Sequence, residues 1–145
     1  IINFDSKDFK KFYAGPLKNN FNKNLYLPKF GNDYFNIIND SKISLNIHTE
    51  SMPGSAGNIR MFEITGVGSC LLTENFNNIP QLFDIDKEVV CYNNLNDLHE
   101  KISFLKKNPN IVKNISLAGQ KKTLNSHCEE NRIKEFNDLF LKLIY

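Results

Sequence analysis

The sequence predicts an α/β domain in which helices cover both faces of a parallel sheet. Segments with strand and helix patterns alternate along the chain, which is typical of βαβ units. Residues 69–73 form a continuous apolar run, as expected of a parallel strand that is buried on both faces. The length of 145 residues is common for one domain and suffices to bury a core without disulfides or metal. We therefore expect a single domain, residues 1–145, without an internal repeat.

The first thirty residues give weaker patterns. We interpret residues 1–4 and 25–27 as short strands, residues 8–13 as a short helix and residues 18–23 as a loop. Because the chain starts with Ile1 rather than Met, inside one of these segments, we expect a piece of a longer two-domain protein.

Caps, turns and apolar spacing predict the remaining elements. Asn32 or Asp33 can cap the first helix, and Gly66 with Gly68 can end the second. In chain order we expect a helix at 33–40, a strand at 43–48, a small-residue loop at 54–57, a helix at 58–65, a strand at 69–73, a short helix at 77–83, a strand at 89–92 and helices at 96–107, 109–124 and 129–143.

The last three helices show apolar side chains at helical spacing. Asn96 or Asp97 can open the first of them, and Pro109 can start the next. The expected buried sides are Leu98, Ile102 and Leu105 in the first, Ile111, Ile115 and Leu117 in the second, and Ile133, Phe136, Leu139, Phe140 and Leu143 in the third.

Composition narrows the function class. A net charge of +2 and a pI of about 8.4 are too mild for a nucleic-acid binder, which concentrates basic residues on one face. Cys70, Cys91 and Cys128 are widely spaced and odd in number, which disfavours a zinc site or a disulfide framework. Cys70 and Cys91 lie in apolar runs and are expected in the core. Without a signal peptide or a transmembrane run, we expect a cytoplasmic protein, with peripheral membrane attachment left open.

The loop after the strand at 43–48 is the candidate binding site. Ligands of open α/β sheets bind beyond the carboxyl ends of the strands. Ser55, Gly57 and Asn58 carry little bulk, so a phosphate could approach their backbone at the start of the next helix. Arg60 could add charge-assisted hydrogen bonds to a diphosphate. Glu63, three residues later on the same side, could accept hydrogen bonds from ribose hydroxyls.

Each of these residues also has a structural interpretation. A Gly/Ser loop is often only a turn, and Arg60 with Glu63 could be an exposed ion pair. The order of these two charges opposes the helix dipole, which favours the functional interpretation slightly. His48, at a strand end, could be catalytic or could contact phosphate, although a lone histidine is more often structural. We expect His99 and His127 to be surface or packing residues.

The remaining motifs point away from a metal or a dinucleotide site. Asp84-Ile85-Asp86 could hold a metal–diphosphate complex, but a turn before the strand at 89–92 explains it better. Gly66-Val67-Gly68 falls at a helix end and is no dinucleotide fingerprint, and no P-loop is present. We expect no metal and no cofactor besides a sugar donor.

Several runs, taken together, resemble one known family. They are SKISLNIH at 41–48, NIRMFE at 58–63 and GVGSCLLT at 66–73, with further matches at 33–35, 82–83, 87–90, 118–120 and 127–132. From about Phe30 to the C-terminus the chain resembles the C-terminal domain of GT-B glycosyltransferases, in particular group-1-like transferases related to spore-maturation CgeB proteins. The resemblance implies a Rossmann-like three-layer α/β/α fold, the C-terminal half of a GT-B fold.

The resemblance also implies how a nucleoside-diphosphate sugar would bind. Backbone groups near Gly57 and Asn58 would hold the diphosphate with help from Arg60, and Glu63 matches the acidic residue that binds the donor ribose. The loop at 28–31, with Phe30 and Gly31, would lie near the base. An N-terminal domain, absent here, would bind an acceptor of unknown kind, which could be a glycan, a lipid or a protein. Arg60 and His48 are the candidate catalytic residues.

The sequence departs from the family at one position and leaves other functions open. Many retaining relatives carry a second glutamate eight residues before the ribose glutamate, where this chain has Ser55. The stereochemical outcome is therefore open. A non-catalytic nucleotide-sugar-binding or scaffolding module is the main alternative. A nucleotide-sugar epimerase of similar fold is a second one, and a flavodoxin-like domain is disfavoured because no acidic cluster follows the early strands.

Overall fold

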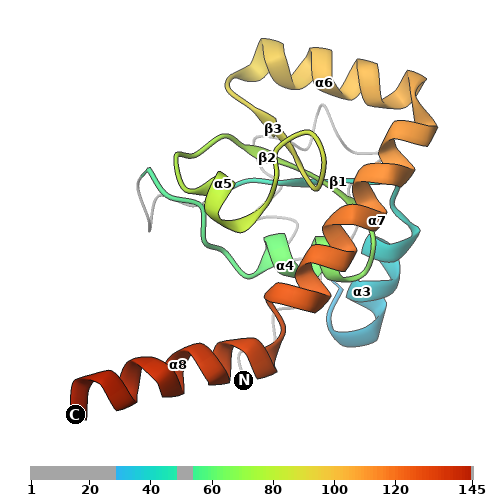
Figure 1. The fold of residues 1–145 in the computed structure, drawn as a ribbon. Helices are drawn as coiled ribbons and strands as arrows, with labels where there is room; N and C mark the ends of the chain where they lie inside the picture. The colour runs from blue at the N-terminus through green and yellow to red at the C-terminus, as the bar shows by residue number, and fades with distance from the viewer. Residues whose placement is uncertain (1–28, 49–53, 145) are drawn as a thin grey trace, which may run out of the picture. The chain divides into compact units, whose positions relative to one another are not determined.

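The computed structural model describes residues 29–48 and 54–144 (Figure 1). The elements expected at 1–4, 8–13, 18–23 and 25–27 lie outside the described residues. The chain divides into two compact units, Ile1–Tyr34 and Phe35–Tyr145, which we describe separately. In the first unit, Lys29 and Asp33 form an exposed ion pair with an N–O distance of 4.0 Å.

The second unit contains a three-stranded parallel sheet. Its strands are β1 (Ile43–Asn46), β2 (Cys70–Glu74) and β3 (Val90–Tyr92), in the order β1-β2-β3. In the register of this sheet, Ile43 lies beside Cys70 and Leu72 lies beside Val90. Because each strand is parallel to the next, the carboxyl ends of all three meet at one edge.

Helices cover both sides of this sheet. The described helices are α3 (Gly31–Asp40), α4 (Arg60–Gly66), α5 (Ile79–Leu82), α6 (Leu95–Lys107), α7 (Pro109–Ser126) and α8 (Glu129–Ile144). In Figure 1, α6 and α4 lie on opposite sides of the strands. The predicted α/β class with a parallel sheet is therefore confirmed.

Alternation along β2 explains how both sides are covered. Cys70 and Leu72 belong to one buried cluster, which also includes Leu105 of α6 and Val112 and Ile115 of α7. The residues between and after them, Leu71 and Thr73, point to the opposite face. All four side chains are buried, as expected for the continuous apolar run.

The element bounds differ from the expected ones by one to two residues. β1 ends at Asn46 rather than His48, and α4 begins at Arg60 rather than Asn58. α6 begins at Leu95, because the Asn94 side chain accepts hydrogen bonds from the backbone N–H groups of Asn96 and Asp97. The cap is thus Asn94, and the helix begins one residue before Asn96, the earlier of the two expected first residues.

Two predicted helix faces differ from the observed ones. In α7 the buried residues are Val112, Ile115, Gly119 and Thr123, whereas the expected Ile111 and Leu117 are exposed. The buried side of α7 is lined partly by small residues, because α4 and the backbone at Glu88, in front of β3, pack closely against it. None of the described residues of α8 is buried, so its apolar stripe is exposed in this unit. No described helix is long and apolar enough to cross a bilayer.

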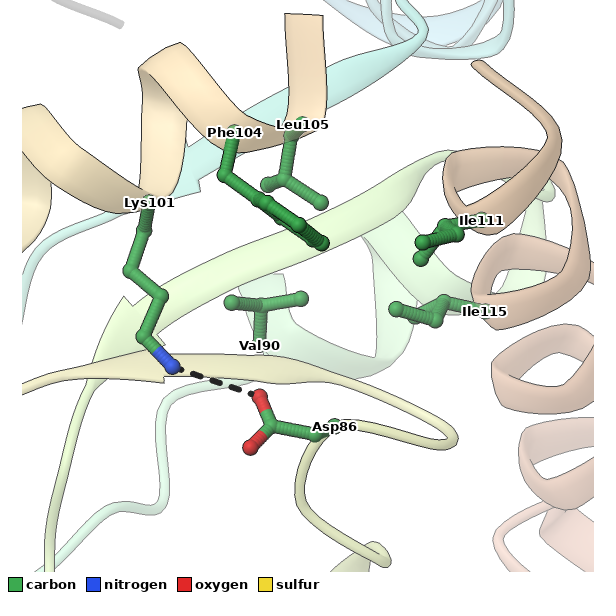
Figure 2. Close-up of a pocket in the computed structure, with 7 residues that line it drawn as sticks. All are labelled: Asp86, Val90, Lys101, Phe104, Leu105, Ile111 and Ile115. Carbon is green, nitrogen blue, oxygen red and sulfur yellow. Dashed lines mark hydrogen bonds and ion pairs between the residues drawn. The ribbon is translucent and has the colours of Figure 1, made fainter. Parts of the chain in front are cut away.

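An apolar hollow of about 460 Å³ lies between α6, α7 and the start of β3 (Figure 2). Phe104 and Leu105 enter it from α6, and Ile111 and Ile115 enter it from α7. An ion pair between Lys101 and Asp86, with an N–O distance of 3.5 Å, crosses its rim. Val90 is the first residue of β3 and Asp86 precedes it, so this hollow lies away from the edge where the strands end. None of the predicted site residues lines it.

Cys70 and Cys91 are buried, which confirms their expected place in the core. Burial raises the pKa of both thiols from about 9.0 to about 11, and the charge of Asp86 adds to the effect at Cys91. In the unfolded chain the thiols ionise at lower pH. The stability that these buried neutral thiols contribute is therefore complete below pH 9 and is lost as the pH rises to about 11.

We therefore expect the free energy of unfolding to fall between pH 9 and 11, by on the order of 2 kcal/mol per thiol. Urea unfolding at several pH values measures this decrease. The decrease of the free energy of unfolding with pH should be smaller in a Cys70→Ala/Cys91→Ala variant. It should be unchanged in Cys128→Ala, whose thiol is only partly buried. Equal slopes in all three proteins would contradict the assignment to the buried thiols.

Candidate functional site

The candidate site lies at the carboxyl edge of the sheet, where a loop leads from β1 to α4. The described parts of this loop are residues 47–48, next to β1, and residues 54–59, next to α4. Gly54 has a φ of 77°, a left-handed conformation that glycine adopts readily. Ala56 is buried, whereas Gly57 is exposed and Ser55 is half-buried. The structure thus confirms a small-residue loop here.

Asn46 ties this loop to the sheet. Its side chain is buried, with 1% of the residue exposed. Its amide nitrogen donates to Thr73 Oγ1 at 3.3 Å, and its amide oxygen accepts from the Asn58 amide at 3.1 Å. Three side chains from β1, β2 and the loop therefore form one chain of hydrogen bonds, which is buried at Asn46 and Thr73 and partly buried at Asn58.

Asn78 fixes the loop from its other side. Its side chain accepts a hydrogen bond from the Ala56 N–H at 2.8 Å and donates one to the Ala56 carbonyl at 2.6 Å. The pair satisfies both backbone groups of Ala56, which is buried. The loop backbone is therefore held by two asparagines before any ligand binds.

Arg60 and Glu63 follow on α4. Helical hydrogen bonding starts with the carbonyls of the two residues before Arg60. The Met61 N–H donates to the Asn58 carbonyl, and the Glu63 N–H donates to the Ile59 carbonyl. Arg60 is exposed and Glu63 is half-buried, one turn apart along the helix. A guanidinium and a carboxylate thus lie within four residues of the fixed loop.

His48 lies two residues beyond the end of β1 and pairs with Glu74, the last residue of β2. One carboxylate oxygen, Glu74 Oε2, accepts the His48 backbone N–H at 2.7 Å and lies 3.1 Å from His48 Nδ1. The histidine side chain is only 6% exposed. The Phe76 ring lies edge-on to the imidazole, with centroids 4.9 Å apart.

Beyond Glu74, a hollow of about 460 Å³ follows the ends of β2 and β3. It is lined by Ile47, Glu74, Asn75, Phe76, Tyr92, Asn93, Asn94 and Leu95. Burial and the charge of Glu74 raise the pKa of Tyr92, so the phenol is held in its neutral form. The edge of the sheet thus offers a carboxylate, amides and aromatic rings, a combination suited to polar ligands with hydroxyl groups.

The other predicted residues lie as follows. Phe30 is exposed, and Gly31 begins α3 with a φ of 57°. Both belong to the unit Ile1–Tyr34, so their placement near a nucleotide base stays a prediction. His99 is exposed. His127 packs between Phe62 and Phe83, as expected of a packing residue.

Asp84-Ile85-Asp86 forms a turn, as favoured from the sequence. The Asp84 N–H donates to the Glu88 carboxylate at 2.8 Å, and the Asp86 N–H donates to the Val89 carbonyl at 2.7 Å. Asp86 has a φ of 62°, which aspartate tolerates in turns. Within the described residues, no three His, Cys, Asp or Glu side chains gather as a metal site would require.

Sequence reasoning missed three residues that build this site: Asn46, Glu74 and Asn78. Asn46 and Glu74 are polar residues at the ends of apolar strands, a signal that could have drawn attention to both. Asn78 directly precedes the short helix α5 and resembles an ordinary helix cap. Its two bonds to Ala56 span 22 residues, so nothing local predicts them.

Fold and site define an α/β domain with a fixed polar loop at the carboxyl ends of parallel strands, the usual position of a ligand site in this class. A family model described as glycosyl transferase-like matches residues 12–138, which is most of the chain. The chain therefore belongs to this glycosyltransferase-like family, whose activity requires a sugar donor and an acceptor. A search among curated proteins gives no match to this chain.

Proposed function

We propose that this chain is the donor-binding domain of a metal-independent GT-B glycosyltransferase. It would form the C-terminal half of such an enzyme, of the group-1-like type related to CgeB proteins. The reaction is the transfer of a sugar from a nucleoside diphosphate to an acceptor. The observation that carries the proposal is the loop at residues 54–59, which hydrogen bonds to Asn46 and Asn78 hold in place directly before α4.

The loop and α4 have separate roles in this proposal. Loop backbone near Ser55, Gly57 and Asn58 approaches the diphosphate, and Arg60 adds hydrogen bonds from its guanidinium. Glu63 accepts hydrogen bonds from the ribose hydroxyls. Because the loop is already fixed, little conformational entropy is lost when the donor binds.

Two further contacts complete the donor site. Phe30 and Gly31 lie beside the base, as the family resemblance implies. His48 faces the sugar end of the donor from the end of β1. The acceptor is bound by a separate N-terminal domain. Catalysis then comes from positioning and from stabilising the departing diphosphate, chiefly through Arg60.

Thermal unfolding with a panel of nucleoside diphosphates and their sugars tests donor binding. A ligand at 100 times its dissociation constant stabilises a protein by about 2.7 kcal/mol. In a domain of this size that raises Tm by about 5–10 °C. We expect such a shift with the diphosphate of one base, and the same shift when EDTA is present.

The shift should be mostly lost in Glu63→Ala, because a carboxylate hydrogen bond contributes about 1.5–3 kcal/mol. Arg60→Ala should reduce the shift for diphosphates more than for nucleosides. Glu100→Ala, on the exposed surface of α6, is the matched control and should keep the full shift. A wild-type chain that shifts with none of the panel would refute the proposal. Binding without transfer in the full-length protein would instead favour a non-catalytic nucleotide-sugar-binding module.

A further inference from the structure

The two half-buried histidines of the described chain differ in how their rings are satisfied. His127 uses both nitrogens: Nε2 lies 2.9 Å from the Leu82 carbonyl, and Nδ1 accepts from Arg132 at 2.9 Å. His48 uses one: Nδ1 bonds to Glu74, while Nε2 is buried and has no hydrogen-bond partner within the described residues. His127 therefore behaves as a packing residue, and His48 does not.

The bond to Glu74 determines where the His48 proton lies. An ionised carboxylate only accepts hydrogen bonds, so Nδ1 must carry the proton. In the neutral imidazole, Nε2 is then left as an acceptor with its lone pair facing outward from the ring. Glu74 Oε2 also holds the His48 backbone N–H at 2.7 Å, which fixes the position of the whole residue.

A buried nitrogen without a hydrogen-bond partner destabilises the folded state, because it has lost its contact with water. The side chain is 94% covered, as its 6% exposure shows, and the Phe76 ring limits its rotation. The structure thus stabilises one ring orientation and one tautomer and leaves one atom unsatisfied. Unsatisfied buried polar groups in native proteins call for an explanation, of which a functional role is one.

We propose that Glu74 is a positioning residue of the donor site. It holds His48 as the Nδ1–H tautomer, so that Nε2 accepts a hydrogen bond from a hydroxyl of the bound sugar. This inference rests on the proposed donor-binding function. Because Nε2 has almost no accessible surface, the hydroxyl reaches it only when atoms around the ring move aside.

Ring ¹⁵N NMR of the labelled chain tests the tautomer directly. We expect the proton of His48 on Nδ1 in the wild-type chain and a shift toward the Nε2–H form in Glu74→Ala. Glu74→Gln keeps an acceptor oxygen and should retain the Nδ1–H form. Glu88→Ala removes a carboxylate that also accepts one backbone N–H bond, and should leave the His48 signals unchanged. A wild-type ring protonated at Nε2 would overturn the inference.

Titration with UDP-glucose and GDP-mannose tests the contact with the donor. The sugar nucleotide that raises Tm should also move the His48 Nε2 resonance, and the matching nucleoside diphosphate without sugar should move it much less. In the full-length enzyme we expect kcat of Glu74→Ala to fall about tenfold or more with KM for the donor nearly unchanged, and Glu74→Gln to restore most of it. A rise in Tm with an unmoved Nε2 signal would reject the role of His48 and Glu74 while leaving donor binding intact. No rise in Tm with any donor would reject both.

Discussion

Replacing Gly119 by alanine is expected to destabilise the domain by about 3 kcal/mol, although alanine normally favours a helix over glycine by about 1 kcal/mol. Gly119 is buried in the middle of α7. A Cβ at this position would overlap with the backbone carbonyl oxygen of Glu88, which leads into β3. A backbone atom cannot rotate away as a side chain can, so α7 would have to move off the sheet.

That movement would also break the contacts between α7 and α4. Thr65 and Thr123 share a buried hydrogen bond of 2.6 Å between their hydroxyls, and Gln120 donates to the Gly66 carbonyl at 3.1 Å. Both bonds require α7 to approach α4 closely. The decrease in the free energy of unfolding in Gly119→Ala should therefore be larger than the steric overlap alone would cause.

Urea unfolding measures this effect, and Gly66→Ala is the matched control. Gly66 also faces the contact between α4 and α7, but a Cβ there would lie 3.6 Å from the Thr123 methyl group, an ordinary van der Waals distance. We expect Gly66→Ala to change the free energy of unfolding by less than about 1 kcal/mol. Equal stabilities of the two variants would show that α7 does not approach the sheet as closely as described.

The same close approach explains why part of the fold could not be predicted from the sequence. Strands could be recognised because residues 69–73 and 89–92 are continuous apolar runs, and their alternation with helices predicts the parallel sheet. The buried residues of α7 include Gly119 and Thr123, whereas the larger apolar residues Ile111, Leu117 and Leu124 are exposed. The spacing of large apolar residues cannot indicate a helix face that is buried because its small side chains allow close packing.

The candidate site shows a similar division between local and non-local signals. Small residues after a strand and before a helix are neighbours in the sequence, so the loop with Ser55, Gly57 and Asn58 could be located. The side chains that hold it could not. Asn46 meets Thr73 across 27 residues, and His48 meets Glu74 across 26. Those contacts depend on the register between β1 and β2, which the sequence does not reveal.

Asn46→Ala should combine a loss of stability with a loss of ligand binding. Removing this side chain leaves the buried Thr73 hydroxyl and the Asn58 amide without the partner that they share. Each buried polar group left unpaired costs about 1–3 kcal/mol, so we expect a total of about 3 kcal/mol in urea unfolding. The loop at residues 54–59 also loses its link to the sheet, and the donor would then have to order it on binding.

The matched control is Asn131→Ala, which removes an asparagine hydrogen bond from the surface of α8, away from the candidate site. The Asn131 amide donates to the Asn125 carbonyl at 2.6 Å in an exposed position, where water can replace the lost partner. We expect this change to lower the free energy of unfolding by less than about 0.5 kcal/mol. The rise in Tm with the best nucleoside diphosphate should shrink in Asn46→Ala and persist in Asn131→Ala. If Asn46→Ala lost stability but kept the full ligand shift, the asparagine would support the fold alone, and loop preorganisation would not contribute to donor affinity.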